Sequence, residues 1–312
     1  MSARGVGFDP HALTIWLPPG TRLAAASPWR RWLAQGDRQA AMPADALHRL
    51  ASLFDVQARS LPVAALLRQT MAGDAGEAAW LCADPAWARV DPNGVRLMAC
   101  GRLGLAADEA DELTAALAPL FAEHGMALHA SAPEHWQLRL PPDLSVPTFV
   151  APEQAMGADL FEYLPSGQAG RAWRRLLNET QVLLHQHPRN AQRQARGLPP
   201  VNTLWFWGAG RLPTNWRSAC LGALSDDELV RALLHHAGRP THAALADALP
   251  ALRPGWLLDL SELSAASLDA LVERLTPLRR WPWRLLTADG VDVALEPWHR
   301  LRFWRRSRDG AR

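Results

Sequence analysis

Short apolar runs and longer amphipathic stretches take turns along this chain. Runs typical of buried strands predict β-strands at 11–17, 79–82, 95–99, 126–130, 135–140, 203–207 and 256–260. Stretches in which apolar residues recur every three or four positions predict helices at 44–54, 61–71, 107–124, 169–187, 226–237, 241–248 and 265–276. Because strands and helices alternate, the pattern indicates an α/β fold.

Two regions carry clearer signals than the rest. Acidic residues fill the first turns of the helix at 107–124, which complements the helix dipole, and Gly125 follows as its C-cap. At the other end of the chain, strands are expected at 283–288, 291–295 and 299–304, with Asp289-Gly290 as a hairpin turn. These last strands predict an antiparallel edge on the sheet, so we expect mixed sheets flanked by helices.

Composition excludes several classes of protein. The 33 basic residues are all arginine, so the chain has no Walker A lysine, no protein-kinase lysine and no lysine for a Schiff base. The formal net charge is only +2, and no apolar run approaches the length of a membrane span, so we expect neither nucleic acid nor membrane as a partner. Three dispersed cysteines form neither a disulfide framework nor a zinc motif, which favours the cytoplasm.

The densest polar chemistry lies between residues 178 and 210. On the expected helix, Asn178, Gln181 and His185 share a polar face, whereas His185 and His187 point to different sides, which argues against a metal clamp. A strand with Trp205 and Trp207 then leads into Gly208-Ala209-Gly210, where a glycine turn would let backbone N–H groups approach an anion. We therefore consider an anion site at Asn190, Arg193, Asn202, Gly208 and Gly210.

The same residues also fit a buried hydrogen-bond network around two tryptophans, and the sequence leaves both interpretations open. The other clusters favour structural roles. His235, His236 and His242 surround a helix C-terminus, which stabilises an imidazolium in any case. The run 279–284 mixes arginine with tryptophan, which suits Trp–Arg packing at a sheet edge.

The stretch 187–210 resembles the archaeal-type, cofactor-independent phosphoglycerate mutases. It reads HPRNAQRQARGLPPVN followed by TLWFWGAG, which matches the pattern HPxNxxRxxxGxxPxN with a later GxG. A bacterial group of phosphoglycerate mutase-like, Rpf-type (RpfE) regulatory proteins is more similar still, because Asn178, Glu179, Gln181, Leu184 and His185 also match it. Upstream, Ala83-Asp84-Pro85 and 134–138 look like that group as well.

This resemblance implies an alkaline phosphatase-like core with an inserted α/β subdomain. We expect the N-terminal part of the core at 1–74, the insertion at 75–145, a helix and motif linker at 146–202, the rest of the core at 203–304 and a tail at 305–312. In such mutases an early Asp, a nucleophilic Ser and later Asp and His ligands would hold two divalent ions. This chain lacks those patterns, so we expect no catalytic residue, no metal and no cofactor.

Three hypotheses about function follow. The first is a non-catalytic regulatory protein that binds a small phosphorylated or anionic ligand and acts on a protein partner. The second is an active mutase or phosphatase with displaced ligands, which would use Mn²⁺ or Mg²⁺. The third is a protein-interaction module that uses the tryptophan-rich C-terminal strands, which would leave an aromatic patch exposed. Oligomeric state does not follow from the sequence.

Overall fold

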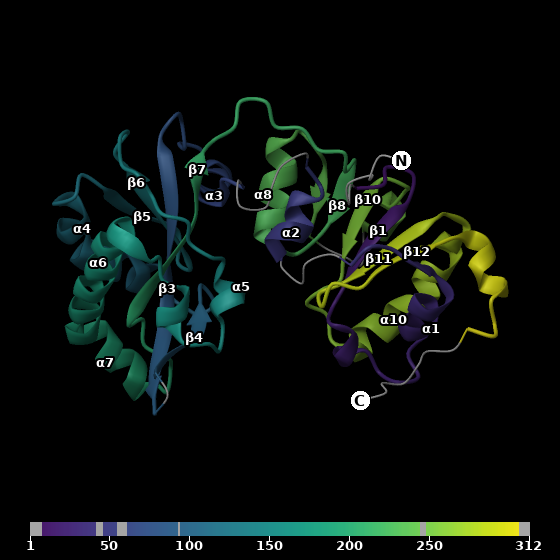
Figure 1. Cartoon of the computed structure of the whole chain (residues 1–312), viewed down its shortest axis with the longest axis horizontal. Coiled ribbons are helices and arrows are strands. Elements are labelled where there is room, and N and C mark those ends of the chain that lie inside the picture. The colour runs from purple at the N-terminus through teal and green to yellow at the C-terminus, as the bar shows by residue number, and fades with distance from the viewer. Residues whose placement is uncertain (1–7, 42–45, 55–60, 93, 244–247, 306–312) are drawn as a thin grey trace. The chain divides into compact units, whose positions relative to one another are not determined.

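The computed structural model describes residues 8–41, 46–54, 61–92, 94–243 and 248–305. It forms two compact units, each with its own β-sheet and flanking helices (Figure 1). The first, which we call the discontinuous unit, combines Met1–Ala58 with Asn215–Arg312. The second, the continuous unit, is Arg59–Thr214. In the described part of the chain, no helix is both long enough and apolar enough to cross a membrane.

A seven-stranded mixed sheet forms the centre of the discontinuous unit. Its order is β2-β12-β11-β1-β10-β8-β9, made of β2 (Asp37–Arg38), β12 (Asp292–Leu295), β11 (Trp283–Thr287), β1 (Leu13–Leu17), β10 (Trp256–Asp259), β8 (Gly222–Leu224) and β9 (Thr241–His242). The strands from β11 to β9 are parallel, while β12 runs antiparallel to both of its neighbours. This confirms the antiparallel edge expected from the C-terminal hairpin.

Helices cover both faces of this sheet. The alternate β1 residues Leu13, Ile15 and Leu17 are fully buried in a core shared with α1 (Pro28–Gln35) and α10 (Ala265–Leu275). On the opposite side, α2 (Ala46–Ala51) places Arg49 over the Trp16 ring. Phe54 stacks on Trp216, whose indole N–H donates to α8 (Glu228–His236). Short 3-10 helices complete the unit: η1 (Gly20–Arg22), η4 (Leu249–Ala251), η5 (Thr276–Arg280) and η6 (Pro297–Leu301).

The continuous unit is built around one long strand, β3 (Ala79–Asp91). It pairs antiparallel with β4 (Gly94–Cys100), β6 (His135–Leu140) and β7 (Thr203–Arg211), while β5 (Ala127–Ala132) pairs with β6. Its helices are α3 (Val63–Met71), α4 (Ala107–Ala122), α5 (Pro152–Ala155), η3 (Leu160–Tyr163), α6 (Gly167–Gln186) and α7 (Pro188–Ala195). Phe206 of β7 contacts Phe121 of α4 and Trp173 of α6, so these two helices share one core with the sheet.

Five local expectations differ from the structure. Strand β3 continues through Asp84-Pro85, and β7 continues through Gly208–Gly210. The expected helix at 241–248 begins instead with strand β9, its residues 244–247 lying outside the described ones, and the expected strand at 299–304 overlaps the 3-10 helix η6. The helix expected from residue 226 begins at Glu228, because Asp227 caps it: the Asp227 carboxylate accepts from the backbone N–H groups of Leu229 and Val230.

The unit boundaries also differ from the expected domains. The continuous unit extends beyond the expected insertion at 75–145 and takes in α3, the helix and motif stretch at 146–202 and strand β7. Strand pairing is the reason, since β7 pairs with β3 from Thr203 to Arg211. Residues 203–211 therefore belong with the insertion, and the discontinuous unit resumes at Asn215.

Candidate functional site

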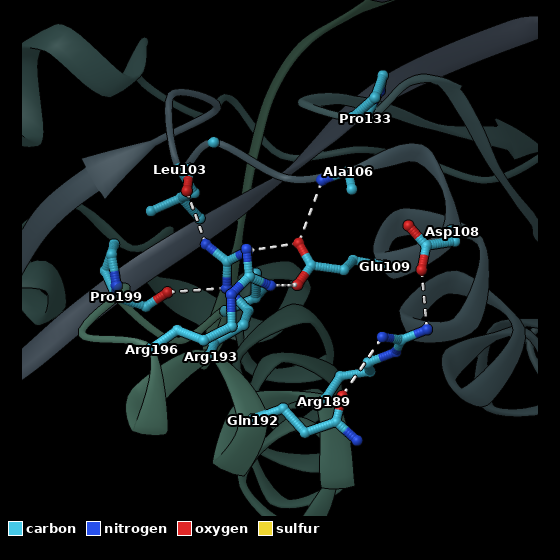
Figure 2. Close-up of polar contacts among 12 residues, drawn as sticks. Leu103, Ala106, Asp108, Glu109, Pro133, Arg189, Gln192, Arg193, Arg196 and Pro199 are labelled. Carbon is cyan, nitrogen blue, oxygen red and sulfur yellow. Dashed lines mark hydrogen bonds and ion pairs between the residues drawn. The ribbon is translucent and has the colours of Figure 1, made fainter.

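Arg193, in the middle of the motif, is completely buried and bonded on every side (Figure 2). Its Nη1 donates to Glu109 Oε2 at 2.7 Å, in an ion pair whose side chains are 0% and 3% exposed. Its Nη2 donates to the carbonyl oxygen of Leu103 at 2.6 Å, and its Nε to that of Pro199 at 3.0 Å. A charge this deeply buried is stable only when it is paired and hydrogen-bonded, and here its partners all come from the protein.

Glu109 is the centre of this arrangement, and sequence reasoning missed it. Arg196 donates to Glu109 Oε1 at 3.2 Å, and the backbone N–H of Ala106 donates to Oε2 at 3.1 Å. Glu109 occupies the third position of α4, so the same carboxylate closes the helix N-terminus. The available signals were an acidic residue in the first turn of the clearest helix, which we interpreted as a dipole effect, and the resemblance of 101–110 to the Rpf-type group.

A second, exposed set of ion pairs joins the same two helices. Arg189 at the start of α7 donates to Glu112 Oε1 at 2.6 Å. It also donates to Asp108 Oδ2 at 2.9 Å (Figure 2). These partners are 51% and 64% exposed, so each pair contributes little by itself. The hydrogen bonds that Arg189 donates to Glu112, followed by the charges of Glu112 and Asp108, raise the pKa of Arg189. The α4–α7 junction is thus fixed by a buried pair with a solvated rim.

The two asparagines of the motif bind backbone. Asn190 is 4% exposed, and its amide nitrogen donates to the carbonyls of Leu184 and Val201 at 2.7 Å each, while its oxygen accepts from Val201 N at 2.8 Å. Asn202 makes a reciprocal pair with Ala88, accepting from its N–H at 2.8 Å and donating to its carbonyl at 2.7 Å. Both amides therefore substitute for strand pairing where the chain enters β7.

The two glycines of the motif allow close packing against α3 and the residue that precedes it. Gly208 has a φ of +63°, and a Cβ there would lie 2.7 Å from Val63 Cβ. A Cβ on Gly210 would lie 2.5 Å from Pro62 Cβ. The β3–β7 register shifts between Trp80 and Cys82, opposite this segment. Glycine is thus required here by a bulged strand under a helix, which differs from the anion-cradling turn expected from the sequence.

The supporting residues of the motif divide into buried and exposed ones. Gln181 donates to the Thr203 hydroxyl at 3.1 Å, and the Trp205 indole donates to the carbonyl of Val150 at 3.0 Å. His187 caps α7, because its Nδ1 accepts from Arg189 N at 3.2 Å. Asn178 and His185 are exposed on α6. Of the two histidines at this helix end, His187 caps α7 and His185 is exposed.

Asp84 is the most unusual titratable group of the continuous unit. It is 3% exposed on β3, and its two oxygens accept from Trp136 N at 3.2 Å and from the Trp207 indole at 2.7 Å. His135 Nδ1 lies 3.8 Å from Asp84 Oδ1. Burial raises the pKa of Asp84 to about 6, against the opposing effects of His135 and the two N–H donors. Trp207 of the motif therefore binds a buried carboxylate of the neighbouring strand.

The structure thus distributes the motif over α6, α7, β7 and the residues between them, and neither of the two cavities described below has a motif residue in its walls. Arg193 joins Glu109, Asn202 joins Ala88, and Trp207 joins Asp84. This arrangement corresponds to the network interpretation of the sequence and differs from the expected anion site, because the donors of Arg193 and Asn190 already meet internal acceptors. An anion at Arg193 would have to displace the carboxylate of Glu109.

In the discontinuous unit, two carboxylates lie at the carboxyl ends of the parallel strands, where open α/β sheets bind ligands. Asp259 ends β10, and its carboxylate accepts from Ser225 Oγ at 2.8 Å and from Ser261 Oγ at 2.6 Å. Asp289, in the β11–β12 turn, accepts from Gly20 N at 3.2 Å. Within the described ranges, no three His, Cys, Asp or Glu side chains are grouped so that they could hold a metal ion.

A cavity of about 830 Å³ opens beside Asp289 at the carboxyl ends of β1 and β11. Its walls include Gly20, Thr21, Arg30 and Arg38. Arg30 uses Nε and Nη2 on the carbonyls of Leu23 and Gly20, whereas the exposed Arg38 guanidinium has no hydrogen-bond partner among the described residues. A second cavity, of about 910 Å³, lies at the amino ends of the same strands, around 8–12 and Pro282.

The remaining clusters of the sequence are used for packing. Arg279 lies over the rings of Trp32 and Trp283, with its guanidinium carbon 5.3 and 5.4 Å from their centres. The Trp–Arg packing expected for 279–284 is therefore present. His242 stacks on Trp256, with 6.1 Å between ring centres. His235 and His236 lie in the last turn of α8.

Comparison with known proteins finds similarity over a short part of the chain. Over 66 residues, this chain is 35% identical to a probable 2,3-bisphosphoglycerate-independent phosphoglycerate mutase of Geobacter sulfurreducens. Over 62 residues, it is 36% identical to the 2,3-bisphosphoglycerate-independent phosphoglycerate mutase of Methanosarcina barkeri. These stretches are 21% and 20% of this chain, and the match spans only 16% of the length of each relative. No family model matches the chain.

Solved structures include two that align along most of the chain at low identity. A cofactor-independent phosphoglycerate mutase from Thermoplasma acidophilum aligns over 91% of this chain and 90% of its own, with 15% identity and a TM-score of 0.42. The PH0037 protein from Pyrococcus horikoshii aligns over 93% and 86%, with 12% identity and a TM-score of 0.49. The sequence matches relate part of this chain to the mutases, and membership of the Rpf-type regulatory group stays a prediction.

Proposed function

We propose that this chain is a phosphoglycerate mutase-like regulatory protein that binds a small anionic ligand and transfers no phosphoryl group. The alkaline phosphatase-like origin of its core is part of the same proposal. One observation carries it: the arginine-lined cavity lies where β1 and β11 end, at the edge of the sheet that binds ligands in α/β proteins. The larger cavity lies at the amino ends of these strands, which is not the usual ligand-binding edge of such a sheet.

The state of the nearby acids supports binding over catalysis. A two-metal site needs several carboxylates and imidazoles whose lone pairs face one point. Here Asp259 accepts three hydrogen bonds, two from Ser261 and one from Ser225, and Asp289 closes the loop after β1 by binding Gly20 N. These carboxylates are occupied in holding loops together. The motif shared with the mutases is likewise occupied, in holding the continuous unit together.

The chemistry of the cavity favours an anion that binds toward Arg38. Arg30, Arg38 and Arg305 face two acids, Asp37 and Asp289. Hydrogen bonds from Arg302 and Arg305 lower the pKa of Asp37 to about 2, so its charge is already matched. Among the described lining residues, the side chains of Arg38 and Thr21 make no hydrogen bond, and a planar guanidinium suits phosphate or carboxylate. The size of the cavity suits a small molecule.

The test of binding is thermal stabilisation of the full chain by inorganic phosphate and by 3-phosphoglycerate. We expect a concentration-dependent rise in Tm, which Arg38→Gln abolishes. Arg22→Gln is the matched control, since Arg22 is an exposed arginine of the neighbouring η1 that does not line the cavity. A rise in Tm that Arg38→Gln leaves unchanged would place the ligand elsewhere and refute this site.

The test of catalysis is the interconversion of 2- and 3-phosphoglycerate by purified protein with Mn²⁺ or Mg²⁺. We expect no turnover above the rate without protein. Turnover that a chelator removes would establish the enzymatic alternative and overturn the regulatory proposal. Phosphatase activity on 3-phosphoglycerate, followed as released phosphate, would do the same.

A further inference from the structure

Four large apolar side chains are exposed together near the end of the described chain. Trp298, Leu301, Phe303 and Trp304 have exposed fractions of 60%, 65%, 76% and 65%. They belong to η6 and to the turn that follows it. Elsewhere in the described ranges, exposed large apolar residues occur singly or as the neighbours Val182 and Leu183. So dense a group marks an interaction surface.

Polar contacts hold the inner side of this segment on the fold. His299 is only 1% exposed, and its Nδ1 accepts from Glu296 N at 3.2 Å. Arg302 donates to both oxygens of Asp37, at 2.6 and 3.2 Å, and Arg305 donates to the carbonyl of Gly36 at 2.8 Å. The segment is thus anchored through its polar residues, and its aromatic residues are the ones left in solvent.

Cations without acidic partners lie beside the aromatic residues. Arg279 is held between Trp32 and Trp283, and its Nη1 is buried with no hydrogen-bond partner. Burial, followed by the charges of Arg300 and Arg31, lowers the pKa of Arg279 to about 10. Among the described residues, the side chains of Arg31 and Arg300 make no hydrogen bond or ion pair. This neighbourhood is therefore one in which an anion would relieve repulsion.

The sequence extends the same charge. Residues 298–312 contain six arginines and one aspartate, 6 − 1 = +5, whereas the whole chain has a net charge of +2. Because the rest of the molecule balances these arginines, the overall charge conceals a locally basic and aromatic segment. This is why composition alone gave no reason to expect a membrane partner.

We propose that the C-terminal surface, formed by Trp298, Leu301, Phe303 and Trp304 with Arg300, docks on an anionic lipid bilayer. Tryptophan and phenylalanine are favoured at the depth of lipid headgroups, where an apolar ring and a polar edge are both satisfied. Guanidinium groups bind the phosphates at the same depth. Arg300 lies in the same 3-10 helix as the exposed Trp298 and Leu301, so apolar and cationic groups are presented together, and a bilayer interface supplies both environments side by side.

The experiment is co-sedimentation of the full chain with vesicles. We expect binding to vesicles that contain phosphatidylglycerol and phosphatidylcholine, at least tenfold weaker binding to phosphatidylcholine alone, and a decrease at high salt. The variant Trp298→Ser/Phe303→Ser/Trp304→Ser should lose at least tenfold in binding with an unchanged Tm, because these side chains are in solvent. Phe161→Ser, which removes an aromatic residue 54% exposed in the continuous unit, is the matched control.

Arg300→Gln separates the role of charge from that of the aromatic residues. It should weaken binding to anionic vesicles and leave the weak binding to neutral vesicles unchanged. No co-sedimentation of the wild type, or equal binding by the aromatic variant, would overturn the proposal. Stabilisation by inorganic phosphate that Arg300→Gln removes, without vesicle binding, would show a site for a free anion instead. Self-association that the aromatic variant abolishes, again without vesicle binding, would assign the surface to a second copy.

Discussion

Arg193 of α7 and Glu109 of α4 form an ion pair with 2.7 Å between Nη1 and Oε2, and neither side chain has appreciable contact with water. The pair connects the motif at 187–210 to the first turn of a helix more than eighty residues earlier. Removing one partner of such a pair leaves an unpaired buried charge, which is far costlier than replacing both.

Glu109→Gln should therefore lower the free energy of unfolding by about 3 kcal/mol. The neutral amide keeps the shape of the side chain but leaves Arg193 without its counter-charge. Urea unfolding followed by circular dichroism measures the change. Glu112→Gln is the control, because it removes a carboxylate of the exposed rim, and we expect its midpoint to match the wild type. Equal midpoints for the two variants would mean that the buried ion pair contributes no more to the free energy of unfolding than an exposed one.

Asn190→Ala should destabilise the protein by about 1–3 kcal/mol, because the N–H of Val201 and two backbone carbonyls would lose their partners in a buried place. Asn178→Ala, at an exposed position of α6, should change stability by less than about 0.5 kcal/mol. Amide hydrogen exchange gives a second measure, since Val201 N–H should exchange faster only in the first variant. Unchanged protection there would contradict the hydrogen bond to Asn190.

Gly208→Ala should cost about 2–4 kcal/mol, the sum of a left-handed backbone and a Cβ forced against Val63. Gly197→Ala is matched in backbone, with a φ of +73°, but has open space around it, so we expect a cost of about 1 kcal/mol. The difference between the two unfolding free energies isolates the contact with α3. If the costs are equal, the glycine is needed for its conformation alone.

Asp84 predicts a pH dependence of stability. Its pKa in the folded chain is about 6, above the ordinary 3.8, so the folded form binds the proton more tightly than the unfolded one. Stability from this group is therefore fully present below about pH 4 and is lost as the pH rises through 6, by about 3 kcal/mol. The test compares the unfolding free energies of the wild type and Asp84→Asn at pH 4 and 7.5. Because both proteins contain all the other titratable groups, the contributions of those groups cancel in the difference between them. The wild type should lose more stability between these pH values than the variant, and parallel profiles would refute the assignment.

Local periodicity predicted most of the helices and strands of this fold. Helix α4, with its acidic first turn and Gly125, and β1, ended by two prolines, follow directly from the sequence. The unit boundaries did not follow, because they depend on β7 pairing with β3 across more than a hundred residues. The prediction of a strand at 299–304 was wrong. Apolar and basic residues do alternate there, but the basic Arg302 binds Asp37 and the apolar residues are exposed to solvent, so the alternation does not mark a strand of the sheet.

The motif was located from sequence, but its use was not. An arginine at position 193 could bind a ligand or an internal carboxylate, and the sequence does not distinguish these roles. Only the structure shows that its partner is Glu109. Gly208 and Gly210 look like a turn because glycine often makes one, whereas here the requirement comes from Val63 and Pro62. Arg38 belongs to no motif, and the role that we propose for it rests on its place in the cavity beside the ends of the parallel strands.

The path of the chain through the continuous unit has a consequence for how the protein folds. Strand β1 pairs with β10 through Thr14 and Leu257, so this sheet cannot close until the chain has been synthesised beyond residue 257. The continuous unit is complete by Thr214, and it packs Gly210 against Pro62, near its two ends. Once folded, it draws residues 62 and 210 together. The loop that must close to bring β1 next to β10 is then effectively much shorter, which lowers the entropic cost of forming the central sheet.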